Sequence, residues 1–184
     1  MRINRTLTNH LIAKNIVPKE DKEIYDYGFE MLFSTLMGYT IVLVTSLLMN
    51  SFFEGMIFLI SFVLLRNYSG GYHADTHIKC NLFLFLSALF VLFMSKVAIP
   101  YIYLIMIYVL LWHMIIMYAP IENKNKPLAE NERKKYKRIS VVLALIFGII
   151  SIILYPMHIV FTRVIILTCF AVAVLMAVVA IDNN

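Results

Sequence analysis

Residues 98–119 read AIPYIYLIMIYVLLWHMIIMYA, a stretch that contains no Asp, Glu, Lys or Arg. A straight helix needs about 20 predominantly apolar residues to cross the hydrocarbon layer of a bilayer. A soluble chain of 184 residues has too small a core to bury such a segment together with the other apolar stretches around it. This stretch therefore predicts a transmembrane helix.

The composition of the whole chain agrees with a lipid environment. Hydrophobic residues make up 61% of the sequence, and charged residues only 15%, against about 25% in typical soluble domains. Residues 1–27 mix basic and acidic side chains and lack a continuous apolar run, so we expect no cleaved signal peptide. The two cysteines, Cys80 and Cys169, lie in different surroundings and predict no disulfide.

The apolar stretches predict an all-α integral membrane protein, with four to six transmembrane helices in a single polytopic domain over residues 1–184. The first, fourth and sixth stretches are long enough to span a bilayer, the third and fifth are marginal, and the second is short enough to be re-entrant. At residues 6–17, apolar side chains at helical spacing predict an amphipathic helix at the membrane interface. The six stretches are 28–50, 51–65, 80–97, 98–119, 139–155 and 158–181.

The basic residues predict the orientation. If all six stretches span and the N-terminus is cytoplasmic, 14 of the 16 Lys and Arg residues face the cytoplasm, and Lys96 and Arg163 are the exceptions. Basic loops resist translocation, so this asymmetry predicts cytoplasmic termini, a cytoplasmic 66–80 segment and a basic cytoplasmic loop at 120–138. The net charge of +5 is then explained by basic loops that face the anionic inner leaflet of the membrane, and we expect no nucleic acid partner.

Residues 66–80, RNYSGGYHADTHIKC, concentrate the groups that carry chemistry. Gly70 and Gly71 allow a tight turn or the close approach of a peptide. Asp75 or Thr76 could cap a helix whose apolar body begins near Cys80. In the first turns of such a helix the dipole favours a thiolate, and a nearby imidazole can take the thiol proton. The segment therefore predicts a nucleophilic cysteine.

Two histidines compete as its partner. On a continuous helix His73 and Cys80 share a face but differ by about 10 Å in height. His77, three residues before Cys80, is the closer neighbour on such a helix. Spacing alone slightly favours His77, unless the chain bends at residues 73–79.

The segment resembles the signature of the accessory gene regulator B family. The run from Arg66 through Gly70-Gly71 and His73-Ala74 to Cys80 carries the resemblance. A second matching feature is Ala119-Pro120, followed by Asn125-Lys126-Pro127 and further basic residues. The similarity in length, span pattern and loop placement covers nearly the whole chain.

This resemblance implies a bacterial membrane cysteine endopeptidase that cleaves the C-terminal part of a small AgrD-like signal propeptide. The remaining peptide closes into a thiolactone or lactone used in quorum sensing. The resemblance makes His73 and Cys80 the catalytic pair, with Arg66, Gly70 and Gly71 in support, and implies that residues 73–79 are not one straight helix. No cofactor or metal is implied.

Several alternatives stay open. Asp75 either orients the imidazole or caps the helix, and His77 is either solvated or supports the site. Lys124 and Lys126 either signal topology or attract an acidic propeptide. The chain can act as a monomer or a homodimer.

A small transporter or channel subunit would need ionisable side chains in its spans, which offer Glu30, Glu54, His113 and Arg163. A non-catalytic sensor would not need Cys80.

Overall fold

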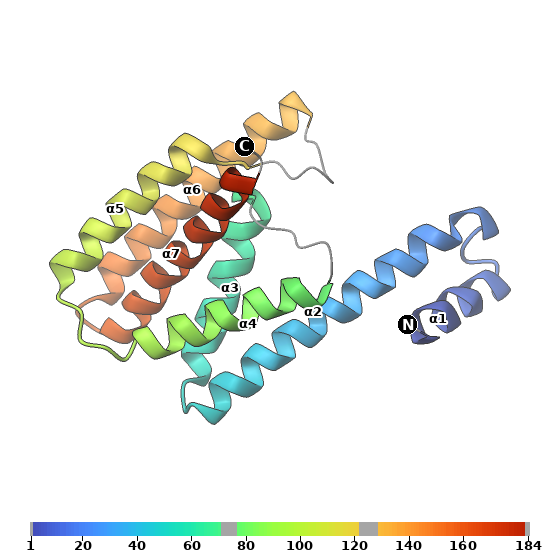
Figure 1. Cartoon of the computed structure of the whole chain (residues 1–184), viewed down its shortest axis with the longest axis horizontal. Coiled ribbons are helices and arrows are strands. Elements are labelled where there is room, and N and C mark those ends of the chain that lie inside the picture. The colour runs from blue at the N-terminus through green and yellow to red at the C-terminus, as the bar shows by residue number, and fades with distance from the viewer. Residues whose placement is uncertain (1, 71–76, 122–128, 183–184) are drawn as a thin grey trace.

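The computed structural model describes residues 2–70, 77–121 and 129–182, and every regular element within these ranges is a helix (Figure 1). The prediction of an all-α protein is therefore confirmed. In chain order the elements are α1 Arg2–Ala13, the 3₁₀ helix η1 Lys19–Asp21, α2 Lys22–Leu48, α3 Phe52–Ser69, α4 His77–Met94, α5 Tyr101–Tyr118, α6 Glu130–Leu154 and α7 Ile159–Asp182.

Within the described ranges, five helices are long and apolar enough to cross a membrane: α2, α3, α5, α6 and α7. The apolar part of α4, Ile78–Met94, is shorter than these. The second apolar stretch of the sequence, which looked short enough to be re-entrant, lies in the unbroken 18-residue helix α3. The helix is longer than the stretch because it continues past residue 65 through Arg66 to Ser69.

Two helices end at an asparagine in the left-handed conformation. Asn15 has φ 56° after α1, and Asn50 has φ 51° after α2. At the end of α2 the Ser51 N–H donates to the Ser46 carbonyl at 2.8 Å, which closes a Schellman motif. The chain therefore turns from α2 into α3 within three residues.

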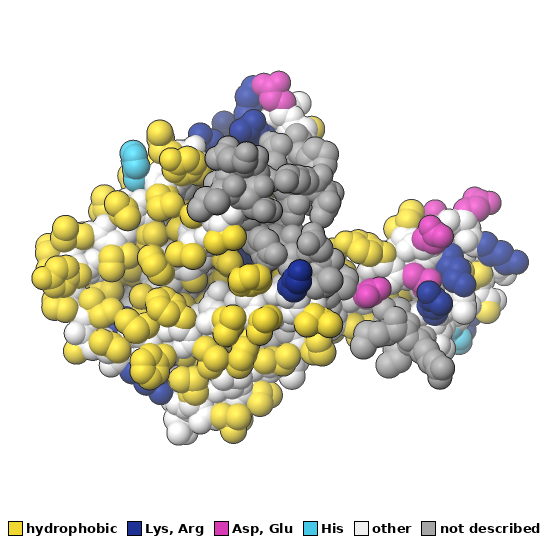
Figure 2. Space-filling view, viewed as in Figure 1, with side chains coloured by type: hydrophobic (Ala, Val, Ile, Leu, Met, Phe, Trp, Pro, Cys, Tyr) yellow, Lys and Arg dark blue, Asp and Glu magenta, His cyan; other side chains and the backbone are white. Residues whose placement is uncertain are grey.

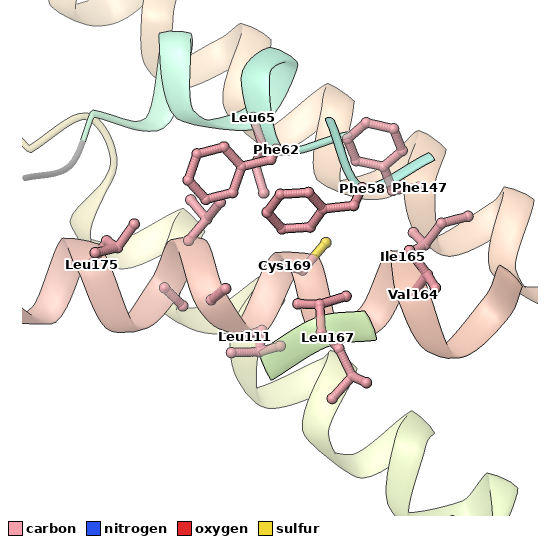
Figure 3. Close-up of a cluster of buried hydrophobic side chains, with 14 of the residues drawn as sticks. Phe58, Phe62, Leu65, Leu111, Phe147, Val164, Ile165, Leu167, Cys169 and Leu175 are labelled. Carbon is pink, nitrogen blue, oxygen red and sulfur yellow. The ribbon is translucent and has the colours of Figure 1, made fainter. Parts of the chain in front are cut away.

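Helix α7 lies at the centre of the bundle, packed against α3, α4, α5 and α6 (Figure 1). Most of its residues from Val164 to Met176 are buried. Figure 3 shows Cys169 of α7 facing Phe58 and Phe62 of α3. Cys169 is 1% exposed, so it serves as a small apolar packing residue.

The bundle has two ends that differ in chemistry. At the first, which we call the turn end (residues 49–51, 95–100 and 155–158), the Lys96 ammonium donates to the Met49 carbonyl at 2.9 Å. The Arg163 guanidinium donates there to the Ser95 carbonyl at 3.3 Å. Each cation thus binds a carbonyl at a helix C-terminus, where the dipole favours positive charge. The opposite end, the motif end, holds residues 66–70, 77–80, 119–121 and 129–136.

Helix α2 projects from the bundle, and α1 folds back along its first turns (Figure 1). The buried residues of α2 lie in the second half of that helix and are Gly38, Val42 and Ser46. Figure 2 shows hydrophobic side chains over most of the bundle face, with charged side chains grouped at the upper margin and on the projecting arm and single ones elsewhere. This distribution is that of a protein whose bundle lies in lipid.

Candidate functional site

Cys80 lies in the first turn of α4, half-buried and not in a disulfide. Its Sγ accepts a hydrogen bond from Nη2 of Arg66 at 3.5 Å. Arg66 comes from the last turn of α3, fourteen positions earlier in the chain. A cation beside a cysteine sulfur stabilises negative charge on that sulfur. The structure thus joins the first and last residues of the 66–80 segment.

Arg66 is held between an aromatic ring and the thiol. Its Cζ lies 5.5 Å from the centre of the Phe62 ring, one helical turn earlier on α3, and Phe62 is 1% exposed. A guanidinium over a ring face is attracted by the quadrupole of the ring. The buried ring therefore limits where the guanidinium can go and keeps it near Cys80.

Tyr39 of α2 forms a third side of this site. Its phenol lies in the neighbourhood of Arg66 and Cys80. The side chain is half-buried and packs against the hydrophobic core. Three helices, α2, α3 and α4, thus each contribute a side chain to the surroundings of Cys80.

Gly70 follows the last residue of α3 and fixes where the 66–80 segment leaves the helix. It has φ 78° and ψ −167°, a combination that is essentially restricted to glycine. It forms an isolated bridge with Ile121, whose N–H donates to the Ser69 carbonyl at 3.1 Å. The two features that carry the family resemblance, the glycine motif and the segment after Ala119-Pro120, therefore meet at the motif end.

The start of α6 also packs against the motif end. The rings of Tyr68 and Tyr136 meet edge to face, with 5.7 Å between their centres. Residues 130–138, which the sequence predicts to lie in a basic loop, instead form the first turns of α6. The helix begins early because the Glu132 carboxylate accepts from the Ala129 N–H at 3.2 Å, and Glu130 pairs with Lys134 at 2.8 Å.

Several predicted site residues lie outside the described residues: Gly71, His73, Asp75, Lys124 and Lys126. His77 is the first residue of α4, and its side chain also lies outside the described part. The choice between His73 and His77 thus stays a prediction. Of the predicted residues, the structure brings Arg66 and Cys80 together and places Gly70 at the end of the same helix.

Sequence reasoning missed Tyr39 and the neighbour of Cys80, Asn81. The Asn81 amide donates to Ser34 of α2, to the backbone carbonyl at 3.0 Å and to Oγ at 3.1 Å. A usable signal existed for Asn81, because an amide inside an apolar helix needs a partner. Tyr39 gave no signal, since tyrosines are common throughout this sequence.

Comparison with known proteins gives one consistent result. The sequence model of the family described as Accessory gene regulator B matches residues 4–181. The chain is 33% identical over 148 residues to a putative AgrB-like protein of Clostridium perfringens strain SM101, covering 74% of the chain and 69% of that protein. With the putative AgrB-like protein 2 of C. perfringens strain 13 it shares 32% identity over 165 residues, 83% of the chain and 77% of the relative.

A more distant relative carries the same family description. The accessory gene regulator protein B of Staphylococcus aureus strain bovine RF122 is 24% identical over 132 residues, which cover 71% of each chain. No solved structure matches this chain.

Proposed function

The chain belongs to the accessory gene regulator B family, and from that premise we propose that it is a membrane cysteine endopeptidase. Its substrate is a small AgrD-like signal propeptide, from which it removes the C-terminal part. The observation that carries the proposal is the contact between Arg66 and Cys80, because a nucleophilic cysteine needs a group that favours its thiolate.

The first step is attack of the Cys80 sulfur on the carbonyl carbon of the scissile peptide bond. His73 takes the thiol proton and then gives it to the amine of the leaving segment. The C–N bond breaks, and the N-terminal part of the propeptide stays on the enzyme as a thioester. Arg66 stabilises charge on the sulfur before attack and again when the thioester breaks.

The second step releases a ring. A thiol or hydroxyl within the bound peptide attacks the thioester carbonyl and passes its proton to the imidazole. The Cys80 thiolate leaves, and a thiolactone or lactone forms. Water has to be kept from the thioester, since hydrolysis gives only a linear product. The half-buried position of Cys80 among α2, α3 and α4 supports such exclusion.

The motif end is proposed to face the cytoplasm, where the propeptide is made. Exposed cations of α6 lie there, and the two cations of the turn end are bound to helix C-termini. This division agrees with the rule that cytoplasmic loops carry the excess of Lys and Arg. The cations of α6 are Arg133, Lys134, Lys135, Lys137 and Arg138.

A transporter would need ionisable side chains that line a path through the bundle. Arg163 instead donates to a helix terminus, and His113 is exposed on α5. Glu54 lies in the first turn of α3, at the turn end. These positions are scattered, so they support the peptidase proposal over a transport pathway.

The test uses the full chain in liposomes with a synthetic AgrD-like propeptide. Hydroxylamine should trap the thioester as a peptide hydroxamate, detected by mass spectrometry. Cys80→Ala should give neither hydroxamate nor cleavage, and Cys169→Ala should behave as the parent because that thiol is buried in the core. Normal cleavage by Cys80→Ala would overturn the proposal.

A further inference from the structure

Helix α4 contacts α2 through a polar joint directly beside Cys80. The Nδ2 of Asn81 donates to the carbonyl of Ser34 at 3.0 Å and to its hydroxyl at 3.1 Å. One turn further along α2, a β carbon on Gly38 would lie 2.6 Å from Oδ1 of Asn81 and 3.2 Å from a Leu84 methyl. The absence of a side chain at Gly38 is therefore what lets Asn81 reach α2.

Neighbouring residues on a helix point about 100° apart. Cys80 accordingly faces α3, where it meets Arg66, while Asn81 faces α2, where it meets Ser34. The two contacts together fix the rotation of α4 about its axis. A rotation of about 20° would move a sulfur lying about 5 Å from the axis by about 2 Å. That shift would break a contact of 3.5 Å.

We propose that Asn81 is a positioning residue for Cys80. Its two hydrogen bonds to Ser34, made possible by the gap at Gly38, hold α4 at the rotation that aligns the thiol with Arg66. The inference rests on the proposed role of Cys80 as the nucleophile. The site then has a second requirement: α4 must be packed against α2 through the Asn81–Ser34 bonds before Cys80 can react.

Hydrogen bonds between membrane helices also stabilise bundles with no bearing on chemistry. A matched contact elsewhere separates the two roles. Thr162 of α7 donates across to the Ser151 carbonyl of α6 at 3.1 Å and is fully buried, near the turn end. Thr162→Val removes an interhelical bond between α6 and α7 in which α2, α4 and Cys80 take no part.

The experiment compares Asn81→Ala, Ser34→Ala and Thr162→Val in the full chain with Cys169→Ala, reconstituted in liposomes. Two rates are measured at one fixed pH: processing of the synthetic propeptide, and alkylation of Cys80 by iodoacetamide. Asn81→Ala should lower kcat between about tenfold and a hundredfold with little change in KM, because misplacement costs reaction rate rather than substrate binding. Ser34→Ala keeps the bond to the carbonyl and should lose less.

The alkylation rate of Cys80 distinguishes the two roles, because they change this rate in opposite directions. Loss of the Arg66 contact should slow alkylation of Cys80 in Asn81→Ala, whereas general loosening of the bundle would expose the thiol and speed it. Ser34→Ala should add nothing to Asn81→Ala, since the shared bond is already gone. Thr162→Val should leave both rates unchanged.

Parent rates in Asn81→Ala, faster alkylation, or an equal kcat loss in Thr162→Val would each overturn the inference. If Asn81→Ala does not insert, Ser34→Ala carries the same test. If the parent itself fails to cleave, the proposed function fails, and the alkylation rates still decide whether Asn81 positions the thiol.

Discussion

The backbone of Gly70 runs directly against that of Ile121. Ile121 donates its N–H to the Ser69 carbonyl, and a β carbon on Gly70 would overlap the carbonyl oxygen of Ile121. The end of α3 is thereby joined to the segment that follows α5, 51 positions further along the chain. The end of the glycine motif and the segment after Ala119-Pro120 are thus joined at this point.

Gly70→Ala should therefore disable processing. Alanine at this backbone conformation costs about 1–3 kcal/mol, and its methyl group displaces Ile121. We expect propeptide cleavage to fall below a tenth of the parent rate, measured by mass spectrometry on membranes with equal protein content. Gly28→Ala is the control, because a β carbon there meets nothing within 4 Å. Parent activity in Gly70→Ala would show that the bridge is dispensable.

The histidine proposed to activate Cys80 can be identified by substitution. His73→Ala should abolish cleavage, whereas His77→Ala should retain at least part of it, as the family resemblance implies. A general base contributes about 10²–10⁴-fold to rate, so the two results are easily separated. Loss of cleavage in His77→Ala alone would instead favour the spacing argument, since α4 begins at His77 and includes Cys80 three positions later.

The spans were predictable because hydropathy is a local property of the sequence. The limits of the helices were less so. Residues 130–138 look like a solvated charge run, yet Glu130 and Glu132 make them the start of α6. In the same way the polar residues after position 65 hide the continuation of α3 to Ser69.

The site was predictable only where a motif marked it. Cys80 and Arg66 stand at the two ends of one segment, so both residues could be picked out from the sequence, whereas their contact could not. Ser34 and Ile121 could not be found in this way, because they reach the site through contacts between helices that are distant along the chain. Such contacts depend on how the helices pack, which spacing within one helix does not encode.

Arg66→Met should slow the chemical step. A hydrogen bond to a charged group contributes about 1.5–3 kcal/mol, so its loss should lower the single-turnover rate about tenfold to a hundredfold. Arg66→Lys should restore little, because an ammonium lacks the fixed fork of the guanidinium. Lys79→Gln, an exposed cation in the same turn as Cys80, controls for the loss of charge. An equal loss of single-turnover rate in Lys79→Gln would show that the positive charge of the region as a whole, and not the contact between Arg66 and Cys80, supports the reaction.

The orientation can be tested by labelling single cysteines in a Cys80→Ser, Cys169→Ala background. Asn131→Cys lies at the motif end, and Met157→Cys lies at the turn end on a residue that is 71% exposed. A membrane-impermeant maleimide added to intact cells should label Met157→Cys and leave Asn131→Cys unlabelled until the cells are opened. The reverse pattern would place the site outside the cell and contradict the proposed substrate.

Lys124 and Lys126 are predicted to attract an acidic segment of the propeptide. Exposed ion pairs contribute at most about 1 kcal/mol each, so Lys124→Gln with Lys126→Gln should weaken binding by no more than about thirtyfold. The loss should shrink at high salt, since screening already weakens these contacts in the parent.

The same double substitution should leave alkylation of Cys80 at the parent rate, which separates recognition from chemistry. Lys134→Gln is the matched control, because this exposed cation of the same basic region is already paired with Glu130 at 2.8 Å. Its substitution should change propeptide affinity less than the double substitution does. If the double substitution binds and cleaves as the parent does at low salt, these two lysines act on topology alone. An equal effect of Lys134→Gln would instead assign attraction to the summed charge of the region.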